Sequence, residues 1–290
     1  QSSSEHSICV AVESAAAENA MIAVDHAFER EISSGIVDPL FVEKDLSVVA
    51  IVSENMKSHP GVSGKMFGAL GRNGINVRAI AQGSSERNIS AVISTTDVRK
   101  ALNVLHEEFF ETTYRQINLF VAGTGNVGKR LLAQLEKQHH FLMQHLRLQV
   151  RVVGLINSRR MVMGEEGLNG NWEQAIENGE KADLKGFISH IIGKNLRNSV
   201  FVDVTANQEV AGVYQSLLQK SIAVVACNKI AASSGYSNYA KLKELAREYN
   251  TRFLFETNVG AGLPVIGTLN DLLRSGDSIN KIEAVLSGTL

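Results

Sequence analysis

The chain has 290 residues, of which 44% are hydrophobic and 20% are charged. This length and balance predict two or three globular domains with well-filled cores. The 29 basic and 30 acidic residues leave a net charge of −1. That charge argues against an overall electrostatic attraction to nucleic acid or to an anionic membrane, so neither is an expected partner.

The cysteine content and the hydropathy indicate the cellular environment. Cys9 and Cys227 are too few for a disulfide framework or a four-sulfur zinc site. No apolar run approaches the roughly 20 residues that cross a bilayer, and no secretory segment is recognisable. We therefore expect a cytoplasmic protein. Because the chain begins with Gln1 rather than Met and ends inside an apolar stretch, we expect it to be part of a longer protein.

An internal repeat marks the first third of the chain. The pattern Q-x-S-S-E-x-x-I begins at Gln1 and again at Gln82, and each copy leads into an apolar stretch and then a helical pattern. Two related units are therefore expected in tandem, the first represented by its C-terminal part at 1–40 and the second at 41–114.

The second unit contains a complete set of element signals. Strands are expected at 46–52, 75–81 and 89–93, and helices at 62–70, ended by Gly74, and at 97–110. The order β-α-β-β-α predicts a ferredoxin-like sandwich that lacks only its last strand.

The repeated Q-x-S-S-E pattern has two interpretations, a polar turn or a ligand-binding loop. A glutamine amide can both donate to and accept from a zwitterionic amino acid. Residues 44–52, 60–63 and 73–86 resemble the regulatory ACT domains of aspartokinases. The resemblance implies that paired ACT domains bind an end-product amino acid. In the bifunctional aspartokinase–homoserine dehydrogenases this is threonine, with which the glutamines matching Gln1 and Gln82 are associated.

A glycine-rich motif opens the rest of the chain. The β-prone segment 116–122 runs into Gly123, Gly125 and Gly128 with the spacing G-x-G-x-x-G, and apolar residues then recur at helical spacing. Between a strand and a helix, such glycines permit a tight turn, the approach of a pyrophosphate and close helix–strand packing. A dinucleotide site is therefore predicted. A glycine turn in an unrelated α/β protein is the alternative.

Strands and helices continue to alternate up to residue 255. Strands are expected at 148–156, 200–204, 222–226 and 252–255, and helices at 184–195, 208–220 and 239–249. The alternation predicts an α/β fold, a Rossmann doubly wound parallel sheet over 115–263. Because ligands bind at the carboxyl ends of such strands, segments 157–160, 205–207 and 227–229 are expected around one crevice.

Two of these strand ends carry basic residues. The end of strand 148–156 has no acidic residue to hold ribose hydroxyls, but it has Arg159 and Arg160, and a guanidinium suits a 2′-phosphate. NADP is therefore preferred, with NAD as the alternative. Lys229 follows strand 222–226, where a partly desolvated lysine can exchange a proton with a substrate oxygen. The simpler interpretation of all three is a solvated side chain.

Five segments of this region look like homoserine dehydrogenase: 120–128, 202–206, 225–229, 256–264 and 286–290. With the ACT-like unit, they make the chain similar to the middle of a bifunctional aspartokinase–homoserine dehydrogenase. The resemblance implies NADP(H)-dependent interconversion of aspartate semialdehyde and homoserine, in threonine and methionine biosynthesis. It also implies control by threonine through the ACT units, and we expect a homo-oligomer.

The resemblance further implies roles for single residues. Lys229 would be one of two catalytic lysines, and Gly288 and Thr289 would begin the substrate pocket, in a domain that starts at 264. Beside Gly123, Gly128 and Arg159, the cofactor would be lined by Gly125, Asn126, Val127, Thr205 and Lys229. A monovalent cation such as sodium would be held by the carboxylate of Glu256 and by the carbonyls of Val259, Ala261 and Leu263.

Elementary chemistry is consistent with the cation. An all-oxygen donor set suits a hard cation, and Gly260 and Gly262 suit a loop that turns carbonyls inward. The alternative is a glycine hinge ahead of the helix-starting Pro264.

Two other functions stay open. One is a regulatory amino-acid sensor whose Rossmann domain binds nucleotide without chemistry. The other is a different semialdehyde dehydrogenase with Cys227 as its nucleophile. Because the family keeps its second lysine and further substrate residues after the position of Leu290, we expect the 290-residue chain alone to bind cofactor but to turn over poorly.

Overall fold

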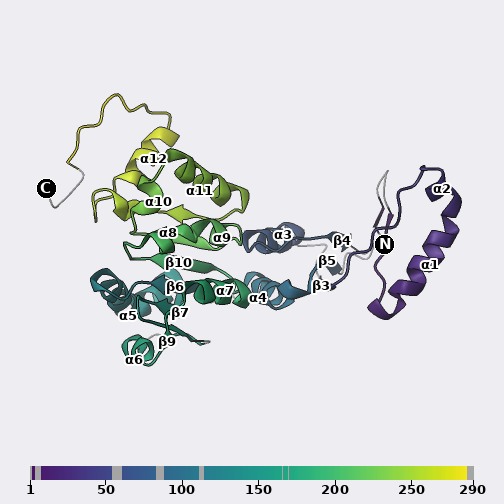
Figure 1. The fold of residues 1–290 in the computed structure, drawn as a ribbon, viewed down its shortest axis with the longest axis horizontal. Coiled ribbons are helices and arrows are strands. Elements are labelled where there is room, and N and C mark those ends of the chain that lie inside the picture. The colour runs from purple at the N-terminus through teal and green to yellow at the C-terminus, as the bar shows by residue number, and fades with distance from the viewer. Residues whose placement is uncertain are drawn as a thin grey trace. The chain divides into compact units, whose positions relative to one another are not determined.

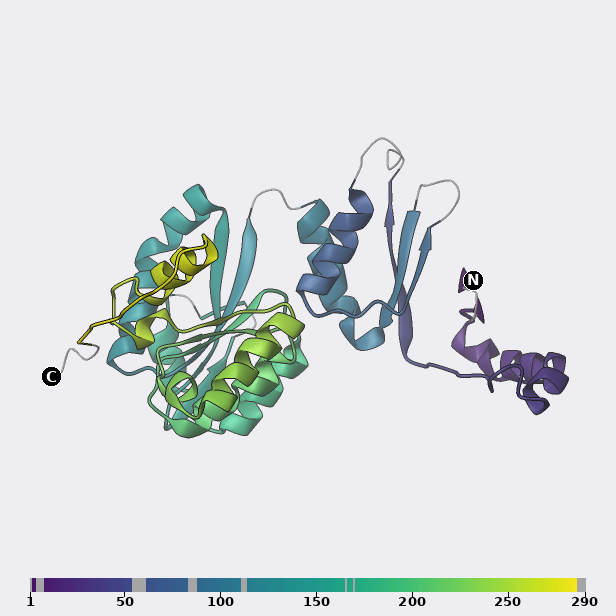
Figure 2. The same cartoon turned by 90° about the horizontal axis from the view of Figure 1, so that it is seen from above.

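The computed structural model describes residues 2–3, 8–53, 61–82, 88–110, 114–164, 166–168 and 170–285. The chain divides into two compact units. The first comprises Gln1–Leu70 and Ile75–Leu102, and the second comprises Gly71–Gly74 and Asn103–Leu290. Figures 1 and 2 show a small antiparallel sheet with helices in the first unit and a larger sheet between helices in the second.

The first unit contains a three-stranded antiparallel sheet. Its strands are β3 (Leu46–Val52), β4 (Ala79–Gln82) and β5 (Asn88–Ser94), in the order β3-β5-β4. With helices α3 (Val62–Arg72) and α4 (Val98–Phe109), these strands confirm the predicted β-α-β-β-α order. Alternate side chains of β5, including Ile89 and Ile93, are buried, as are Met66 of α3 and Ala101 of α4, so one face of the sheet forms the core.

The strand expected at 75–81 begins only at Ala79. Gly74 has a φ of +69°, and the N–H of Ile75 donates to the carbonyl of Leu70 at 3.0 Å. Ile75 therefore completes the C-terminal cap of α3 instead of pairing in the sheet.

The N-terminal segment carries two short helices where the sequence predicts one helical pattern. They are α1 (Ala17–Ala27) and α2 (Glu29–Ser33), which follow the 3₁₀ turn η1 (Ser14–Ala16). Upstream, β1 (Ser2–Ser3) pairs antiparallel with β2 (Ile8–Cys9).

The second unit is built on a seven-stranded sheet. Its strands are β6 (Arg115–Ala122), β7 (Leu148–Ile156), β8 (Arg160–Met163), β9 (Glu180–Lys181), β10 (Ser199–Asp203), β11 (Ala223–Ala226) and β12 (Phe253–Leu254). The order is β12-β11-β10-β6-β7-β8-β9. The five strands from β12 to β7 are parallel. Because the chain leaves β6 toward β7 and later returns to β10, the topological switch point lies between β6 and β10.

Helices cover both faces of this sheet. They are α5 (Asn126–Leu146), α6 (Trp172–Glu177), α7 (Leu184–Lys194), α8 (Gln208–Gly212), α9 (Tyr214–Leu218), α10 (Ile230–Ser233) and α11 (Tyr236–Glu248). A further helix, α12 (Ile266–Arg274), has no buried residue. Phe120 belongs to a buried cluster with residues of α7, α9 and α11, whereas Val121 belongs to a second cluster with residues of α5 and α6. Successive strand residues point to opposite faces, so the predicted doubly wound fold is confirmed.

The sheet is not parallel throughout, however. Strands β8 and β9 extend it in the antiparallel sense. The connection from β7 to β8 is a short turn, and a parallel crossover needs a dozen or more residues. The helix expected at 208–220 is also divided, because Val213 caps the end of α8 and the start of α9.

A nearly buried ion pair fastens the end of α4 within the second unit. The side chains of Glu107 and Arg197 are 14% and 12% exposed, and Nε of Arg197 lies 3.3 Å from the Glu107 carboxylate. The same carboxylate accepts from the N–H of Gln116 at 2.9 Å and from the amide of Asn198 at 3.3 Å. Since Gln116 lies in β6 and Asn198 directly precedes β10, Glu107 ties the C-terminal part of α4, which belongs to the second unit, to the amino ends of two central strands.

We predict that Glu107→Ala lowers the free energy of unfolding of the second unit by about 2 to 3 kcal/mol, because it removes the counter-ion of a largely buried guanidinium. The measurement is a urea titration followed by the fluorescence of Trp172, the single tryptophan, which is 7% exposed and lies in this unit. Glu244→Ala, at an exposed position of α11, is the control and should stay within about 0.5 kcal/mol. Equal urea midpoints for both variants would contradict the role of Glu107.

Candidate functional site

The candidate site lies at the carboxyl edge of the large sheet, where β6, β10 and β11 end side by side. Asp203, the last residue of β10, is in register with Ala122 of β6 and with Ala226 of β11. The loops that follow the three strands therefore start at one level. They are the glycine-rich loop, the loop that holds Thr205, and the loop that leads to Lys229. The structure thus brings these three predicted segments together.

The three glycines of the loop have three different environments. Gly123 has a φ of +105°, which L side chains rarely adopt. A Cβ at Gly128 would collide with the carbonyl oxygen of Gly123, so helix and loop pack backbone to backbone there. Gly125 has no atom within 4 Å of such a Cβ, which leaves its surface open. These environments match the turn, the packing contact and the open approach that a pyrophosphate loop needs.

The start of α5 offers N–H groups to that open surface. Gly125 is the N-cap residue, so Asn126 and Val127 begin the first turn, and both are exposed. The first N–H groups of a helix have no partner within it, and they form a natural anion site with the helix dipole.

A buried carboxylate organises the neighbouring loops. Asp203 is fully buried and accepts hydrogen bonds from the N–H of Thr205 at 2.8 Å, the hydroxyl of Tyr214 at 2.6 Å and the amide of Asn228 at 3.0 Å. Burial and the adjacent Asp203 carboxylate raise the pKa of Tyr214 well above its ordinary value. The tyrosine therefore remains a hydrogen-bond donor to Asp203.

Asn228 extends the network to the next loops. Its amide also donates to the carbonyl of Asn207 at 2.9 Å, and its side-chain oxygen accepts from the N–H of Ile230 at 3.1 Å. The side chain of Asn258 donates to the backbone carbonyl of Asn228 at 3.2 Å. The backbone on either side of Lys229 is thus held from three directions.

Lys229 lies at the start of α10, with an exposed side chain. It borders a hollow of about 460 Å³ whose lining combines hydroxyl and aromatic groups: Ser233, Ser234, Tyr236, Tyr239 and Phe255. Asn258 also lines this hollow, and its buried Oδ1 has no hydrogen-bond partner among the residues that the structure describes. A hollow lined by an ammonium, hydroxyl groups and an amide suits a small polar ligand.

The two arginines after β7 differ in their contacts. A guanidinium nitrogen of Arg160 donates to the carbonyl of Gly179 at 2.8 Å. Within the described ranges, no hydrogen bond or ion pair is found for the exposed guanidinium of Arg159. Arg159 is therefore the one of the two whose side chain is available to a phosphate.

The predicted cation ligands lie in the turn that leads to α12. Both oxygens of Glu256 accept N–H groups at the start of α12, from Ile266 and from Gly267, each at 2.8 Å. The carbonyl of Leu263 accepts from the N–H of Val265 at 3.0 Å. Gly260 and Ala261, with φ of +71° and +51°, turn the backbone sharply. The donor set is all oxygen, and each oxygen keeps a second lone pair, so the residues fit a hard cation.

Gln1, Gly288 and Thr289 lie outside the described residues, and Gln82 is the last residue of β4.

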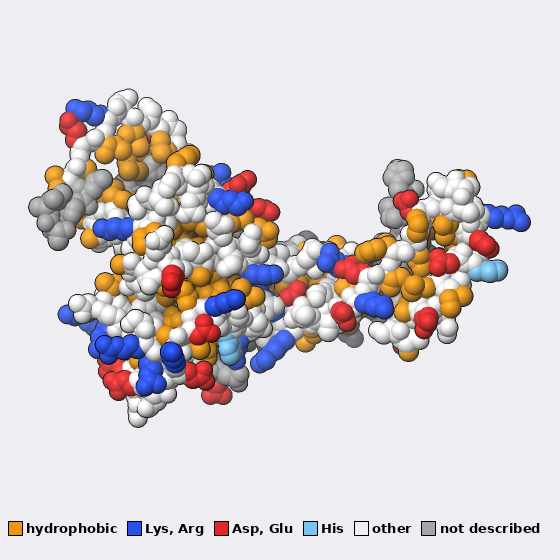
Figure 3. All heavy atoms as spheres, viewed as in Figure 1, with side chains coloured by type: hydrophobic (Ala, Val, Ile, Leu, Met, Phe, Trp, Pro, Cys, Tyr) orange, Lys and Arg blue, Asp and Glu red, His pale blue; other side chains and the backbone are white. Residues whose placement is uncertain are grey.

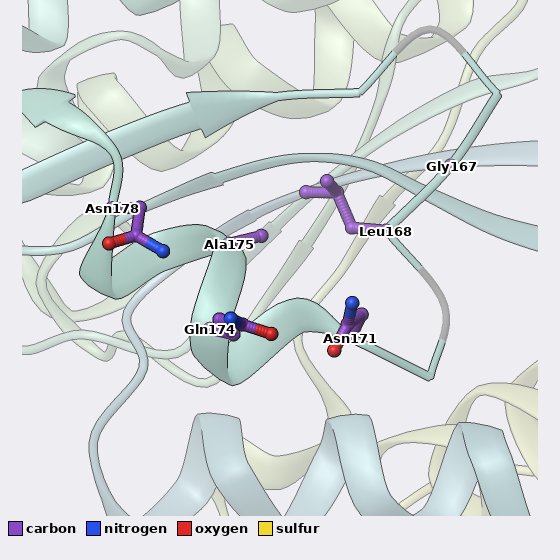
Figure 4. A pocket seen from close by; sticks show the side chains of 6 residues that line it. All are labelled: Gly167, Leu168, Asn171, Gln174, Ala175 and Asn178. Atoms are coloured by element: carbon purple, nitrogen blue, oxygen red, sulfur yellow. The ribbon is translucent and has the colours of Figure 1, made fainter.

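Other surface features of the described residues add no chemistry to the site. A second hollow, of about 430 Å³, is lined by α6 and the segment before it, with Asn171, Gln174 and Asn178 among its residues (Figure 4). No group of three His, Cys, Asp or Glu residues within the described ranges could hold a metal ion, and none of the helices found there is long and apolar enough to cross a membrane. Figure 3 shows acidic and basic side chains interspersed on the viewed face.

The sequence analysis missed Asp203, Tyr214 and Asn228. The available signal was an acidic residue at the end of an otherwise apolar strand, because a buried carboxylate needs several donors nearby. The identity of those donors depends on contacts between distant segments.

Two segments of the chain match the models of known domain families. Residues 49–109 match the model of an ACT domain, and residues 123–256 match the NAD-binding domain of homoserine dehydrogenase. Over its whole length, the chain is 38% identical to a chloroplastic bifunctional aspartokinase/homoserine dehydrogenase of Arabidopsis thaliana and 38% identical to the bifunctional aspartokinase/homoserine dehydrogenase of Haemophilus influenzae. The chain therefore resembles one segment of the bifunctional aspartokinase/homoserine dehydrogenases.

The chain spans about a third of the length of these relatives, 32% of the Arabidopsis protein and 36% of the Haemophilus protein. The segment that matches the NAD-binding domain contains the glycine-rich loop, Thr205 and Lys229. A crystal structure of a protein of unknown function from Candida auris has a similar fold, with a TM-score of 0.53 and 27% identity over 60% of this chain and 48% of that one.

We predict that Tyr214→Phe lowers the free energy of unfolding by about 1 to 3 kcal/mol, because the fully buried Asp203 loses a hydrogen-bond donor. Tyr236→Phe, at a side chain that is 80% exposed, is the matched control and should change it by less than about 0.5 kcal/mol. Urea titration with Trp172 fluorescence measures both. A Tyr214→Phe variant as stable as the control would show that the Asp203 network does not support this edge.

Proposed function

We propose that this chain carries the cofactor-binding part of a homoserine dehydrogenase, which interconverts aspartate semialdehyde and homoserine with NADP(H). The observation that supports the proposal best is the convergence of the glycine-rich loop, Thr205 and Lys229 at one sheet edge, in a chain that resembles this family. The chain spans about a third of the length of its relatives. We therefore propose the dehydrogenase activity for a longer protein that contains this chain.

The cofactor would lie along the carboxyl edge of the sheet. The N–H groups of Asn126 and Val127, with Gly123, Gly125 and Gly128 around them, would hold the pyrophosphate. Thr205, whose methyl group lies beside Gly123, would line the path toward the nicotinamide. Arg159 would grip the 2′-phosphate, which favours NADP over NAD. When bound, the nicotinamide would supply the hydride exchange with the substrate carbon.

Lys229 would handle the proton of that reaction. Reduction of the aldehyde carbonyl places negative charge on its oxygen, and a neighbouring ammonium can deliver the proton that makes it a hydroxyl. In the reverse direction the same group takes the proton back. The hollow beside Lys229 offers space for this approach. Gly288 and Thr289 are proposed to begin the substrate pocket.

The cation is proposed at the turn before α12. Its ligands would be the carboxylate of Glu256 and the carbonyls of Val259, Ala261 and Leu263. A monovalent cation such as sodium would hold this turn closed, in addition to the two hydrogen bonds from Glu256 to α12.

The ACT domain is proposed to bind an amino-acid effector, threonine, with Gln1 and Gln82 as ligands. Gln82 ends β4, where its backbone pairs with Ile89 of β5. An effector controls activity only if it binds two states of the protein with different affinities. We further propose that the protein acts as a homo-oligomer in the cytoplasm.

We predict that Lys229→Ala lowers kcat for aspartate semialdehyde reduction by at least about 100-fold, because a general acid contributes factors of this size. NADPH affinity should change little. The assay uses a protein of the relatives' full length that contains this chain. Lys220→Ala is the control and should keep full activity. Lys220 is exposed and precedes the amino end of β11, whereas Lys229 follows its carboxyl end. Unchanged turnover in Lys229→Ala would remove the lysine from the mechanism. A parent protein that binds NADPH without turnover would favour the regulatory sensor.

We predict that Arg159→Ala weakens NADPH binding by about 10-fold or more, since a charge-assisted pair with phosphate is lost. NADH, which has no 2′-phosphate, should bind as before. Fluorescence titration of the 290-residue chain with each cofactor measures both affinities. Arg160→Ala is the matched control, because its guanidinium is already bonded to Gly179. An equal loss for NADPH and NADH in Arg159→Ala would contradict the assignment.

A further inference from the structure

Asn157 is the first residue after β7, the strand end that faces the adenosine ribose in a dinucleotide fold. Its side-chain oxygen accepts two backbone N–H groups, from Arg159 and from Arg160, each at 2.8 Å. Its own N–H donates to the carbonyl of Arg160 at 2.9 Å. Asn157 therefore closes the turn 157–160 on itself.

The same side chain also reaches the glycine-rich loop. Its amide nitrogen donates to the hydroxyl oxygen of Thr124 at 2.9 Å. Because the two backbone N–H groups fix which end of the carboxamide is the oxygen, the amide must face Thr124. One side chain thus connects the pyrophosphate loop with the turn that carries the two arginines.

The turn holds the backbone of Arg159 from both sides. Its N–H is bound by Asn157, and its carbonyl accepts from the N–H of Ala182 at 3.0 Å. The guanidinium of Arg160 donates to the carbonyl of Gly179, whereas within the described ranges no hydrogen bond or ion pair is found for that of Arg159. The backbone hydrogen bonds therefore fix the point from which the available side chain of Arg159 extends.

We propose that Asn157 is a positioning residue that sets the preference for a cofactor with a 2′-phosphate, by fixing the backbone from which Arg159 reaches that phosphate. The inference rests on the proposed NADP(H) binding. An aspartate could accept the same two N–H groups, but it would place a negative charge beside the phosphate. The carboxamide provides the same geometry without that charge.

The test measures NADPH and NADH affinities of the 290-residue chain by fluorescence titration, for Asn157→Ala, Asn157→Ser, Arg159→Ala and the double variant. We expect Asn157→Ala to lower the NADPH-to-NADH affinity ratio by about fivefold or more. Without the Asn157 side chain the backbone of Arg159 is less ordered, so its charge-assisted hydrogen bond to the 2′-phosphate is weakened. Serine can still accept N–H groups two and three residues on, so Asn157→Ser should recover most of the ratio.

The double variant separates positioning from general damage to the fold. If Asn157 acts through Arg159, Asn157→Ala has no further effect on the ratio once Arg159 is alanine. An equal loss of both affinities in Asn157→Ala, or a further fall of the ratio in the double variant, would overturn the inference while leaving the proposed function intact. Failure of the parent chain to bind either cofactor would overturn both.

Discussion

The functional edge of the second unit depends on one buried carboxylate. Asp203 has no solvent contact, and it is satisfied by donors from three segments: the loop after β10, the start of α9 and the loop after β11. Moving a carboxylate out of water costs several kcal/mol unless donors replace the water. Displacing any one of the three segments therefore removes a donor from the buried carboxylate and destabilises the positions of the other two. This network positions the backbone at Thr205 and beside Lys229, although neither of the two side chains is hydrogen-bonded to Asp203.

The residue pattern predicted the parts of the fold that follow from local chemistry. Strand β7 was predicted with its observed bounds because nine successive residues suit a doubly covered strand. The glycine-rich loop was also predicted, since each of its three glycines occupies a position between strand and helix where a side chain would interfere with the turn, the ligand or the packing. The antiparallel β8–β9 extension and the break at Val213 were not predicted. The break directly follows Gly212, the last residue of α8, so a local stop signal was present but was not used. The antiparallel extension depends on tertiary packing.

Single side chains show where sequence reasoning stopped. Arg159 and Arg160 are chemically identical in the sequence, and the difference between them arises from the carbonyl of Gly179, which lies far along the chain. Glu256 was predicted as a cation ligand, and its carboxylate proves to cap α12 through two N–H groups. A sequence shows which donors and acceptors exist, but it does not show which of them are already occupied.

In the second unit, the residues proposed to select the cofactor and the lysine proposed to transfer the proton lie in different loops. The groups proposed to select the cofactor lie on a four-residue turn at one side of the switch point, whereas Lys229 and its hollow lie beyond β10 on the other. Substitutions in the turn can therefore alter which reductant a descendant of this protein uses while its reaction stays the same, so that the two traits are free to evolve separately.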